Sequence, residues 1–186
     1  VQTGELSDIG EALTTNIEDS YRMGLEVSAG YTPCKWLNLE VNGAFSRNRI
    51  LAFDEYVSYN WDEYFQVKHH ESSTLAFSPS VILNGMATFT WRGLKAVWHT
   101  NFVSKQYLDN TACEARSLPR YSTTAIRLSY TQKLKKNNAR MKQVIFRVDF
   151  NNIFNRHFPL RGWVYSSVVP DYGFTEDNRY YQIGYN

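Results

Sequence analysis

The sequence predicts an all-β protein, an antiparallel meander of about seven strands. Three observations lead to this fold class. Apolar and polar residues alternate with a period of two along most of the chain, short and long connections follow one another in turn, and no segment carries a convincing helical pattern. At 186 residues the chain is long enough for one domain with a sizeable core.

The first two expected strands, Tyr21–Tyr31 and Leu37–Arg47, show the alternation most clearly. In the first, the apolar row is Tyr21, Met23, Leu25, Val27, Ala29 and Tyr31, opposite Arg22, Gly24, Glu26, Ser28 and Gly30. In the second, the apolar row is Leu37, Leu39, Val41, Gly43 and Phe45, opposite Asn38, Glu40, Asn42 and Ala44. Successive side chains of a strand point to opposite faces, so each segment has two chemically different faces.

Five further segments continue the pattern. They are Leu75–Trp91, Leu94–Phe102, Ser122–Leu134, Val144–Phe154 and a weaker final strand, Arg179–Asn186. Their apolar rows include, in the same order, Leu83 and Phe89, Trp98 and Phe102, Ile126 and Leu128, Phe146 and Val148, and Tyr181 and Ile183. Their polar rows are mostly small or polar, with scattered charges, and one of them contains His99.

The connections between these strands alternate strictly in length. Residues 31–36, 91–94 and 134–141 form short polar or turn-forming links. Arg49–Ser72, Leu108–Arg120 and His157–Asn178 are much longer. A meander with short turns at one end and long loops at the other is typical of outer-membrane barrels, and connections this long are uncommon in compact domains unless they are functional.

Composition excludes several other classes of protein. A net charge of +2 with 20% charged residues does not favour nucleic acid as a partner. The mean hydropathy of −0.45 is too polar for a helical membrane protein, and no apolar run approaches the 18 or so residues of a membrane helix. Cys34 and Cys113 are too few for a disulfide framework or a zinc site, so we expect two unpaired cysteines and no bound metal or cofactor.

Aromatic residues lie near the ends of the expected strands. They are Tyr21, Tyr31, Trp36, Trp91, Tyr107 and Tyr121. Tyr and Trp gather at both surfaces of a membrane because their rings are amphipathic, so these residues are consistent with the aromatic girdles of a transmembrane barrel. Ordinary aromatics at the edge of a soluble core would give the same pattern. In the membrane interpretation, the apolar rows face lipid and the polar rows face the lumen.

Five sequence blocks, in order, resemble the C-terminal barrel strands of TonB-dependent outer-membrane receptors, particularly the Bacteroidetes type. They are TNIEDSYRMGLEVSAGYTPCKWLNLEVNGAFSRNRI, SPSVILNG, LKAVWHTNFVSKQYLDNT, LPRYSTTAIRLSY and FRVDFNNIFNRHF. The most specific pieces are SKQYLDNT at Ser104–Thr111 and NNIFN at Asn151–Asn155, followed by Gly162 and Trp163.

This resemblance implies a section of a 22-stranded transmembrane β-barrel with short periplasmic turns and long extracellular loops. Residues 1–186 would be the C-terminal part of the barrel, without the plug domain, the TonB box and the end of the final strand. The implied function is uptake of a scarce nutrient, such as a ferric siderophore, haem or cobalamin, at the cell outer membrane. The implied partners are outer-membrane lipids, the nutrient, the TonB complex through the missing N-terminal part, and a surface lipoprotein.

Ligand-binding candidates lie in the first long connection, ILAFDEYVSYNWDEYFQVKHH. They are Tyr56, Tyr59, Trp61, Tyr64, His69 and His70. Aromatic surfaces stack on haem, corrin or catecholate rings, and histidines ligate iron. Consecutive histidines on a regular strand point to opposite faces, so both bind one metal only in an irregular loop. The alternative is that these aromatics pack the loop against its neighbours while the histidines are solvated.

Two other functional classes stay open, and catalysis is not expected. A passive porin shares the alternation and the loop asymmetry but lacks the five blocks in order. A soluble all-β ligand-binding domain would bury the apolar rows in a core. No serine and histidine share a face with an acidic or amide partner in the manner of a hydrolase, and there is no phosphate loop and no paired metal-ligand motif. We therefore expect no enzyme.

Overall fold

The computed structural model describes residues 2–6, 12–14, 19–61, 64–134, 142–175 and 179–185. These residues form an all-β structure with two short 3₁₀ turns, η1 (Glu114–Arg116) and η2 (Pro170–Tyr172). Among them, no helix is long and apolar enough to cross a membrane. The expected all-β class is confirmed, and the sheets are antiparallel apart from one short parallel pairing.

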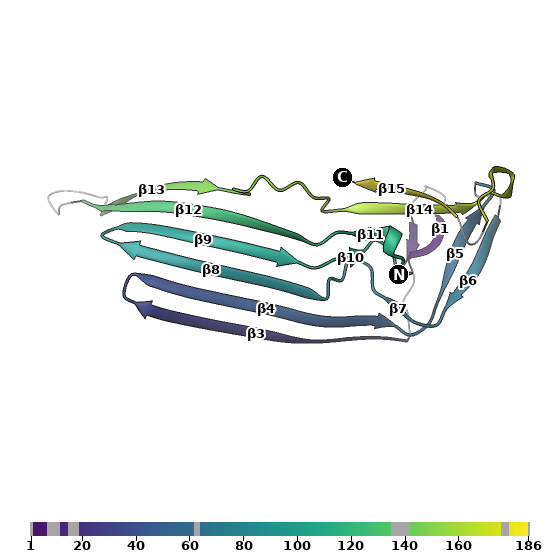
Figure 1. Cartoon of the computed structure of the whole chain (residues 1–186), viewed down its shortest axis with the longest axis horizontal. Helices are drawn as coiled ribbons and strands as arrows, with labels where there is room; N and C mark the ends of the chain where they lie inside the picture. Colours follow the sequence, from purple (N-terminus) through teal and green to yellow (C-terminus); the bar gives the residue numbers. More distant parts are fainter. Residues whose placement is uncertain are drawn as a thin grey trace.

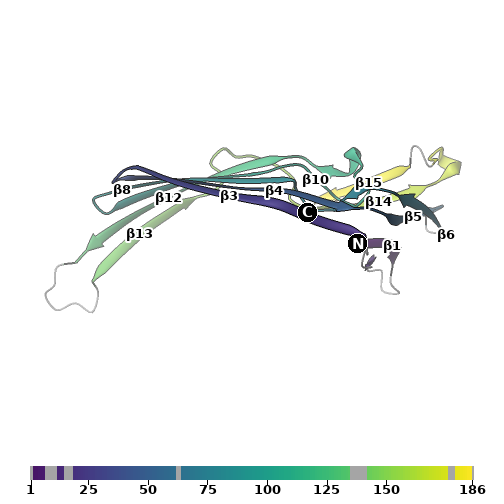
Figure 2. The same cartoon turned by 90° about the horizontal axis from the view of Figure 1, so that it is seen from below.

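A long sheet makes up most of the molecule. Its strands, in spatial order, are β13 (Gln143–Phe150), β12 (Tyr121–Lys133), β9 (Leu94–Val103), β8 (Val81–Trp91), β4 (Leu37–Ile50) and β3 (Ser20–Cys34). Each pairs antiparallel with its neighbours, and β7 (Ser73–Thr74) pairs with the end of β4. The sheet is a thin, curved single layer and does not close into a barrel (Figures 1 and 2).

The short connections all lie at one end of the long sheet, which we call the turn end (Figure 1). They are the Lys35–Trp36 turn, the Arg92–Gly93 turn and the link from Leu134 to Lys142, of which residues 135–141 lie outside the described part. The opposite end, the loop end, carries the long connections. The predicted sorting of connections by length is therefore observed.

The long connections contain strands that the alternation did not reveal: β5 (Phe53–Tyr59), β6 (Tyr64–His70) and β14 (Gly162–Val168). With the expected final strand, β15 (Tyr180–Tyr185), they form a second sheet at the loop end in the order β15, β14, β5 and β6. We call it the loop-end sheet. Two small hairpins pair β1 (Gln2–Leu6) with β2 (Ala12–Thr14) and β10 (Gln106–Tyr107) with β11 (Ser117–Leu118).

Two expected strand boundaries and one expected pairing need correction. The strand expected from Leu75 begins at Val81, because Phe77 has a positive φ of 50° and Pro79 cannot donate to a ladder. The strand expected to reach Phe154 ends at Phe150, before Asn152 and its φ of 49°. The final segment is a strand, but it pairs with β14 in the loop-end sheet and does not extend the meander.

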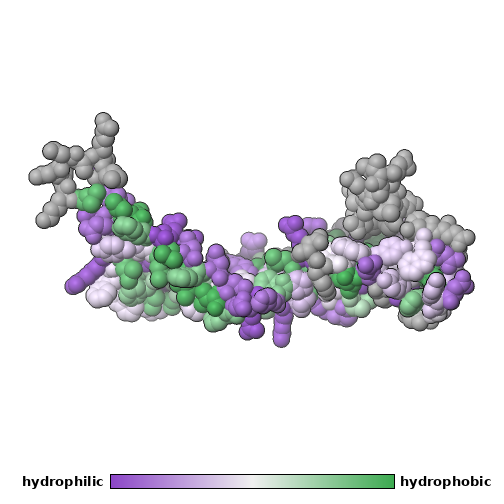
Figure 3. Space-filling view, turned by 90° about the horizontal axis from the view of Figure 1, so that it is seen from above, coloured by the Kyte–Doolittle hydropathy of each residue, from purple (hydrophilic) through white to green (hydrophobic). Residues whose placement is uncertain are grey.

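Register places all the apolar rows of the long sheet on one face. Cross-strand partners share a face, and the pairs Leu25–Phe45, Val41–Gly85, Ala87–Trp98, Trp98–Ile126 and Leu128–Val148 join the six rows. Many large members of this apolar face are exposed, including Met23, Leu25, Val41, Trp98, Phe146 and Val148. Seen edge-on, hydrophobic side chains reach the surface along the long sheet (Figure 3).

The opposite, polar face carries hydrogen bonds between side chains of neighbouring strands. Asn84 Nδ2 donates to Asn42 Oδ1 at 3.0 Å, and Asn101 Nδ2 donates to Asn84 Oδ1 at 2.8 Å, so an asparagine ladder crosses β4, β8 and β9. Arg127 and Asp149 form an ion pair between β12 and β13. His99 lies on this face, as expected, opposite Met86 and Ala125.

The buried residues gather toward the loop end and leave most of the long sheet without a core. Among the described residues, the buried apolar side chains are Ile50, Val57, Val103, Leu108, Leu118, Val168 and Val169. They come from the ends of β4 and β9 and from the long connections. Tertiary packing therefore joins the loop-end sheet to the rest of the molecule, while the long sheet is held mainly by its ladders.

Candidate functional site

The loop-end sheet joins two of the long connections directly. Strand β5 of the first pairs in parallel with β14 of the third, at Ser58–Ser167 and Tyr59–Val168. The Ser58 hydroxyl lies 3.1 Å from the Tyr165 hydroxyl and 3.2 Å from that of Ser167, and Ser167 Oγ also donates to the Ser58 carbonyl at 3.2 Å. Ser58 and Ser167 are both buried, so these bonds satisfy groups that would otherwise be costly to desolvate.

A buried ionic cluster brings in the second long connection. Oε1 of Glu55, on β5, lies 3.0 Å from Nη1 of Arg116 in η1 and 3.2 Å from Nη1 of Arg179, just before β15. Oε2 of Glu55 lies 2.8 Å from Nε2 of His70 on β6. Arg116 is only 2% exposed and also reaches Oδ2 of Asp109 at 2.7 Å. We call these five residues the Glu55 cluster.

The cluster determines the charge state of Glu55. Burial raises the pKa of the carboxyl, but the hydrogen bond from His70 and the positive charges of Arg179 and Arg116 outweigh burial, so the net pKa is below its ordinary value. Glu55 is therefore an ionised carboxylate that balances buried arginine charge. Removing one partner of such a cluster leaves an uncompensated buried charge, which is strongly destabilising.

The second long connection is also held by backbone contacts. Asn110 accepts a hydrogen bond from Ser73 Oγ at its carbonyl and one from the Ala76 N–H at its Oδ1, the latter at 2.8 Å. The Leu108 N–H donates to the Arg116 carbonyl at 2.8 Å, which closes the segment next to η1. On its exposed side, Lys105 Nζ lies 2.5 Å from Oε1 of Glu114. The segment that carries Arg116 is thus held by contacts on its buried side and on its exposed side.

The predicted aromatic candidates all fall on the β5–β6 hairpin but do not form one surface. Tyr59 and Tyr64 are cross-strand partners in the backbone ladder, and the side chain of Tyr64 lies outside the described part. Tyr56 lies on the face opposite to that of Tyr59, because it is three residues from Tyr59 on a regular strand. Both Tyr56 and Tyr59 are partly buried.

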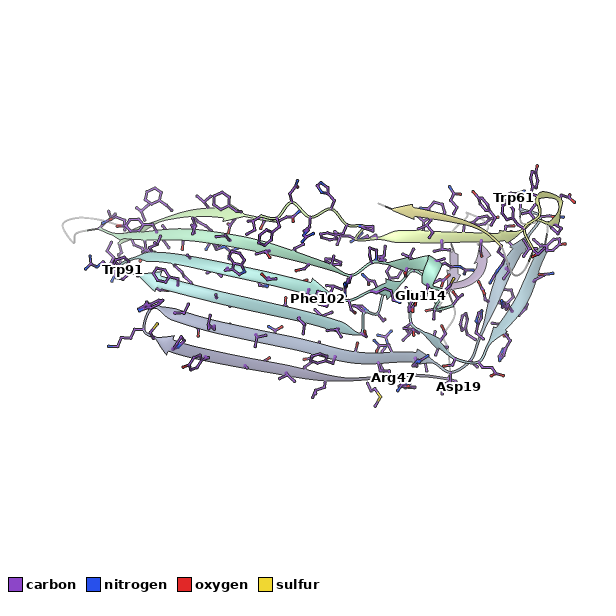
Figure 4. All side chains as sticks on the ribbon, in the orientation of Figure 1. Asp19, Arg47, Trp61, Trp91, Phe102 and Glu114 are labelled. Atoms are coloured by element: carbon purple, nitrogen blue, oxygen red, sulfur yellow. The ribbon has the colours of Figure 1, made fainter. Side chains whose placement is uncertain are left out.

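Trp61 occupies the β5–β6 turn. Its φ of 58° and that of 48° at Asn60 turn the chain back. Its ring makes an edge contact with Tyr180, with ring centroids 5.3 Å apart, and Tyr180 in turn contacts Phe174 at 5.5 Å. Trp61 is nonetheless 49% exposed and lies at the outer end of the loop end (Figure 4). It therefore combines ring packing with an accessible surface.

The two histidines separate onto opposite faces of β6, as a regular strand requires. His69 Nδ1 lies 2.7 Å from Asp54 Oδ1 in an exposed pair, whereas His70 joins the Glu55 cluster and stacks on Phe53, with ring centroids 4.8 Å apart. They cannot share one metal ion in this geometry. Within the described residues, no group of three or more His, Cys, Asp or Glu side chains could hold a metal. Cys34 and Cys113 are free thiols.

Sequence reasoning missed the Glu55 cluster apart from His70. Glu55 lies in the first long connection, Asp109 and Arg116 lie in the second, and Arg179 directly follows the third. Asp109 belongs to the SKQYLDNT block, but that block gives no sign of its buried partner. The only local signal is a run of charges among aromatic residues in 53–71, which does not indicate the partner of any of them.

Compared with known proteins, the chain matches no protein-family model, no curated protein and no solved structure.

Proposed function

We propose that the long sheet is a section of the wall of a transmembrane β-barrel in an outer membrane, and that the protein is a receptor of the TonB-dependent class. The single observation that carries the proposal is the apolar face, in register across six neighbouring strands and open along its length. Burying a large apolar side chain is worth about 1.5–3 kcal/mol, and lipid supplies that burial without a second protein layer.

Strand length and connection length agree with the same proposal. A tilted strand needs about 9–11 residues to cross a bilayer. Strands β3, β4, β8, β9 and β12 have between 10 and 15 residues. Short turns on one side and large ordered segments on the other are the usual asymmetry of outer-membrane barrels. The apolar face then meets lipid and the asparagine ladder faces the lumen.

The proposal of a TonB-dependent receptor, and not just any outer-membrane barrel, rests on the five ordered sequence blocks, which a passive porin would lack. In that class the outer loops capture a nutrient, and import depends on a plug domain and on contact with the TonB complex. We propose that the loop-end sheet takes part in capture of a ferric siderophore, haem or cobalamin. The ring of Trp61, exposed at the outer end of the loop end, is one candidate surface for stacking.

Spin labels on neighbouring residues test the membrane orientation. Single cysteines at Leu39, Glu40, Val41 and Asn42, in a chain whose own cysteines are changed to serine, would be labelled after reconstitution in lipid vesicles. Labels at positions 39 and 41 should collide with oxygen, which concentrates in lipid. Labels at positions 40 and 42 should collide with a water-soluble nickel chelate. Equal nickel access at all four positions would overturn the lipid-facing assignment.

Growth of a deletion strain tests the receptor class. Cells without the full-length gene would be given ferric siderophore, haem or cobalamin as the only source of iron or of the vitamin. We expect a growth defect on one of these that the intact gene restores and Trp61→Ala restores less well. Normal growth on all three sources would contradict nutrient uptake of this kind, even if the spin labels place the sheet in the membrane.

A further inference from the structure

The three short connections lie side by side at the turn end. Backbone hydrogen bonds join each to its neighbour or close it: Thr90 N–H to Trp36 O at 2.8 Å, Thr131 N–H to Gly93 O at 2.9 Å, and Leu134 N–H to Lys142 O at 3.1 Å. The two turns and the two ends of the last link therefore form one continuous edge of the long sheet (Figure 1).

The charged side chains along this edge are all basic. They are Lys35, Arg92, Lys95, Lys133 and Lys142, and all of them are exposed. No Asp or Glu occurs in the described stretches 33–38, 88–97, 129–134 and 142–146. The loop end differs, because it carries both acidic residues, such as Asp54 and Asp109, and basic ones, such as Lys68 and Arg120. The described stretches of the turn end have basic residues alone. We call the five basic residues the basic edge.

Aromatic side chains border the basic edge. Trp36 and Trp91 are 49% and 58% exposed, and Trp36 makes an edge contact with Phe89, with ring centroids 5.5 Å apart. The Arg92 guanidinium lies 5.2 Å from the centroid of the Trp91 ring. Trp91 is labelled on the left side of Figure 4, at the turn end. Indole rings prefer the boundary between the polar and apolar parts of a bilayer. The basic edge is therefore next to residues suited to that boundary.

We propose that the basic edge binds the phosphate groups of anionic phospholipids. The inference rests on the proposed membrane orientation, which puts these side chains at the level of the headgroups of one leaflet. Lys and Arg near a membrane surface are attracted to anionic lipids. A lipid fits better than free phosphate, because the apolar face begins at Leu37 and Leu94, directly beside the basic residues. The acyl chains of a lipid held by its phosphate can lie along that face.

Vesicle flotation tests the proposal. The full chain would be folded into phosphatidylcholine vesicles with and without phosphatidylglycerol, and the bound fraction measured at low and high salt. The test variant changes Lys35, Arg92, Lys95, Lys133 and Lys142 to Gln. The matched control changes five exposed basic residues elsewhere to Gln: Arg47, Lys68, Arg120, Arg156 and Arg161. Both variants lose the same net charge.

We expect phosphatidylglycerol to strengthen partitioning of the original chain, with salt weakening the effect. Each basic residue contributes about a fivefold factor to the affinity for the anionic surface. The test variant should therefore lose its preference for phosphatidylglycerol vesicles by at least about a hundredfold. The control variant should keep that preference.

Equal loss of the preference in both variants, or no loss in the test variant, would overturn the proposal. Binding to pure phosphatidylcholine with alternating spin-label access would then still support the membrane orientation, whereas no binding to either vesicle would contradict the orientation itself.

Discussion

Arg116 and Glu55 are 61 positions apart in the chain, yet Nη1 of Arg116 lies 3.0 Å from Oε1 of Glu55. Each belongs to a different long connection, and Arg179, which directly follows the third, reaches the same carboxylate oxygen. The Glu55 cluster therefore ties three connections together at one buried point. It gives the loop end a defined structure beside a long sheet that has little core of its own.

Replacing Arg116 by Met tests how much this tie contributes. The change leaves Glu55 and Asp109 without their shared cation in a buried setting, so we expect a loss of about 3–5 kcal/mol of unfolding free energy. Urea unfolding in detergent micelles measures it. Arg120→Met, at an exposed arginine nearby, should change stability by no more than about 0.5 kcal/mol. A cost for Arg116→Met as small as this control would mean that the cluster does not hold the loop end.

Acidification should weaken the same cluster. The pKa of Glu55 is lowered from 4.5 in the folded chain, so its contribution is complete above that value and disappears as the pH falls through the folded pKa. His70, Arg116 and Arg179 face this carboxylate from three elements, and Asp109 faces Arg116. Unfolding free energies measured below pH 5 should fall less steeply in Glu55→Gln. An unchanged slope in the variant would assign the acid sensitivity to other groups.

The two adjacent histidines should differ in their effect on stability. His70→Gln weakens a contact to a nearly buried carboxylate, and we expect a cost of about 1–2 kcal/mol. His69→Gln weakens a pair in which both side chains are more than half exposed, so its cost should stay below about 0.5 kcal/mol. Denaturant midpoints of the two variants compare them directly. The reverse order would mean that the exposed pair matters more than the buried contact.

The proposed lipid-facing assignment predicts unequal costs for arginine at two neighbouring positions. Val41→Arg would place a charge on the apolar face near the middle of the membrane and should cost about 2–4 kcal/mol. Asn42→Arg would lose one exposed hydrogen bond from Asn84, worth about 1 kcal/mol. Folding free energies in lipid vesicles measure both. A larger cost at Asn42 would mean that the faces are assigned the wrong way round.

The Arg92–Gly93 turn gives a test of local backbone geometry. Gly93 has a φ of 88°, and a Cβ there would lie 2.8 Å from the Thr131 carbonyl oxygen. Gly93→Ala should therefore cost at least about 1–2 kcal/mol. Gly30→Ala is a suitable control, because its nearest neighbour to a Cβ is the Leu39 carbonyl at 3.9 Å. Equal denaturant midpoints for the two variants would show that the turn adapts to the added methyl group.

The sequence predicted the long sheet well because alternation is a local property. A period of two reports which residues share a face, and register then joins those faces, as Leu39 joins Ala87 and Tyr31. It failed in the long connections. Strands β5 and β6 carry ionisable and aromatic residues on both faces, and β14 has apolar residues on both faces, so none of the three shows a clean apolar row opposite a polar one. The final strand was found, but its partner was not, because pairing depends on where β14 lies.

By itself, the sequence determined an all-β chain of two-faced strands, free cysteines, short links at one end and long segments at the other. Only the tertiary structure decided that Glu55, Arg116 and Arg179 meet, and that His69 and His70 have separate partners. The physical reason is that a buried charge has to find its counter-charge wherever the folded chain brings one near. Here the paired residues are more than 60 positions apart in the sequence, so the folded arrangement of the long connections decides whether they meet. No local sequence pattern records that arrangement.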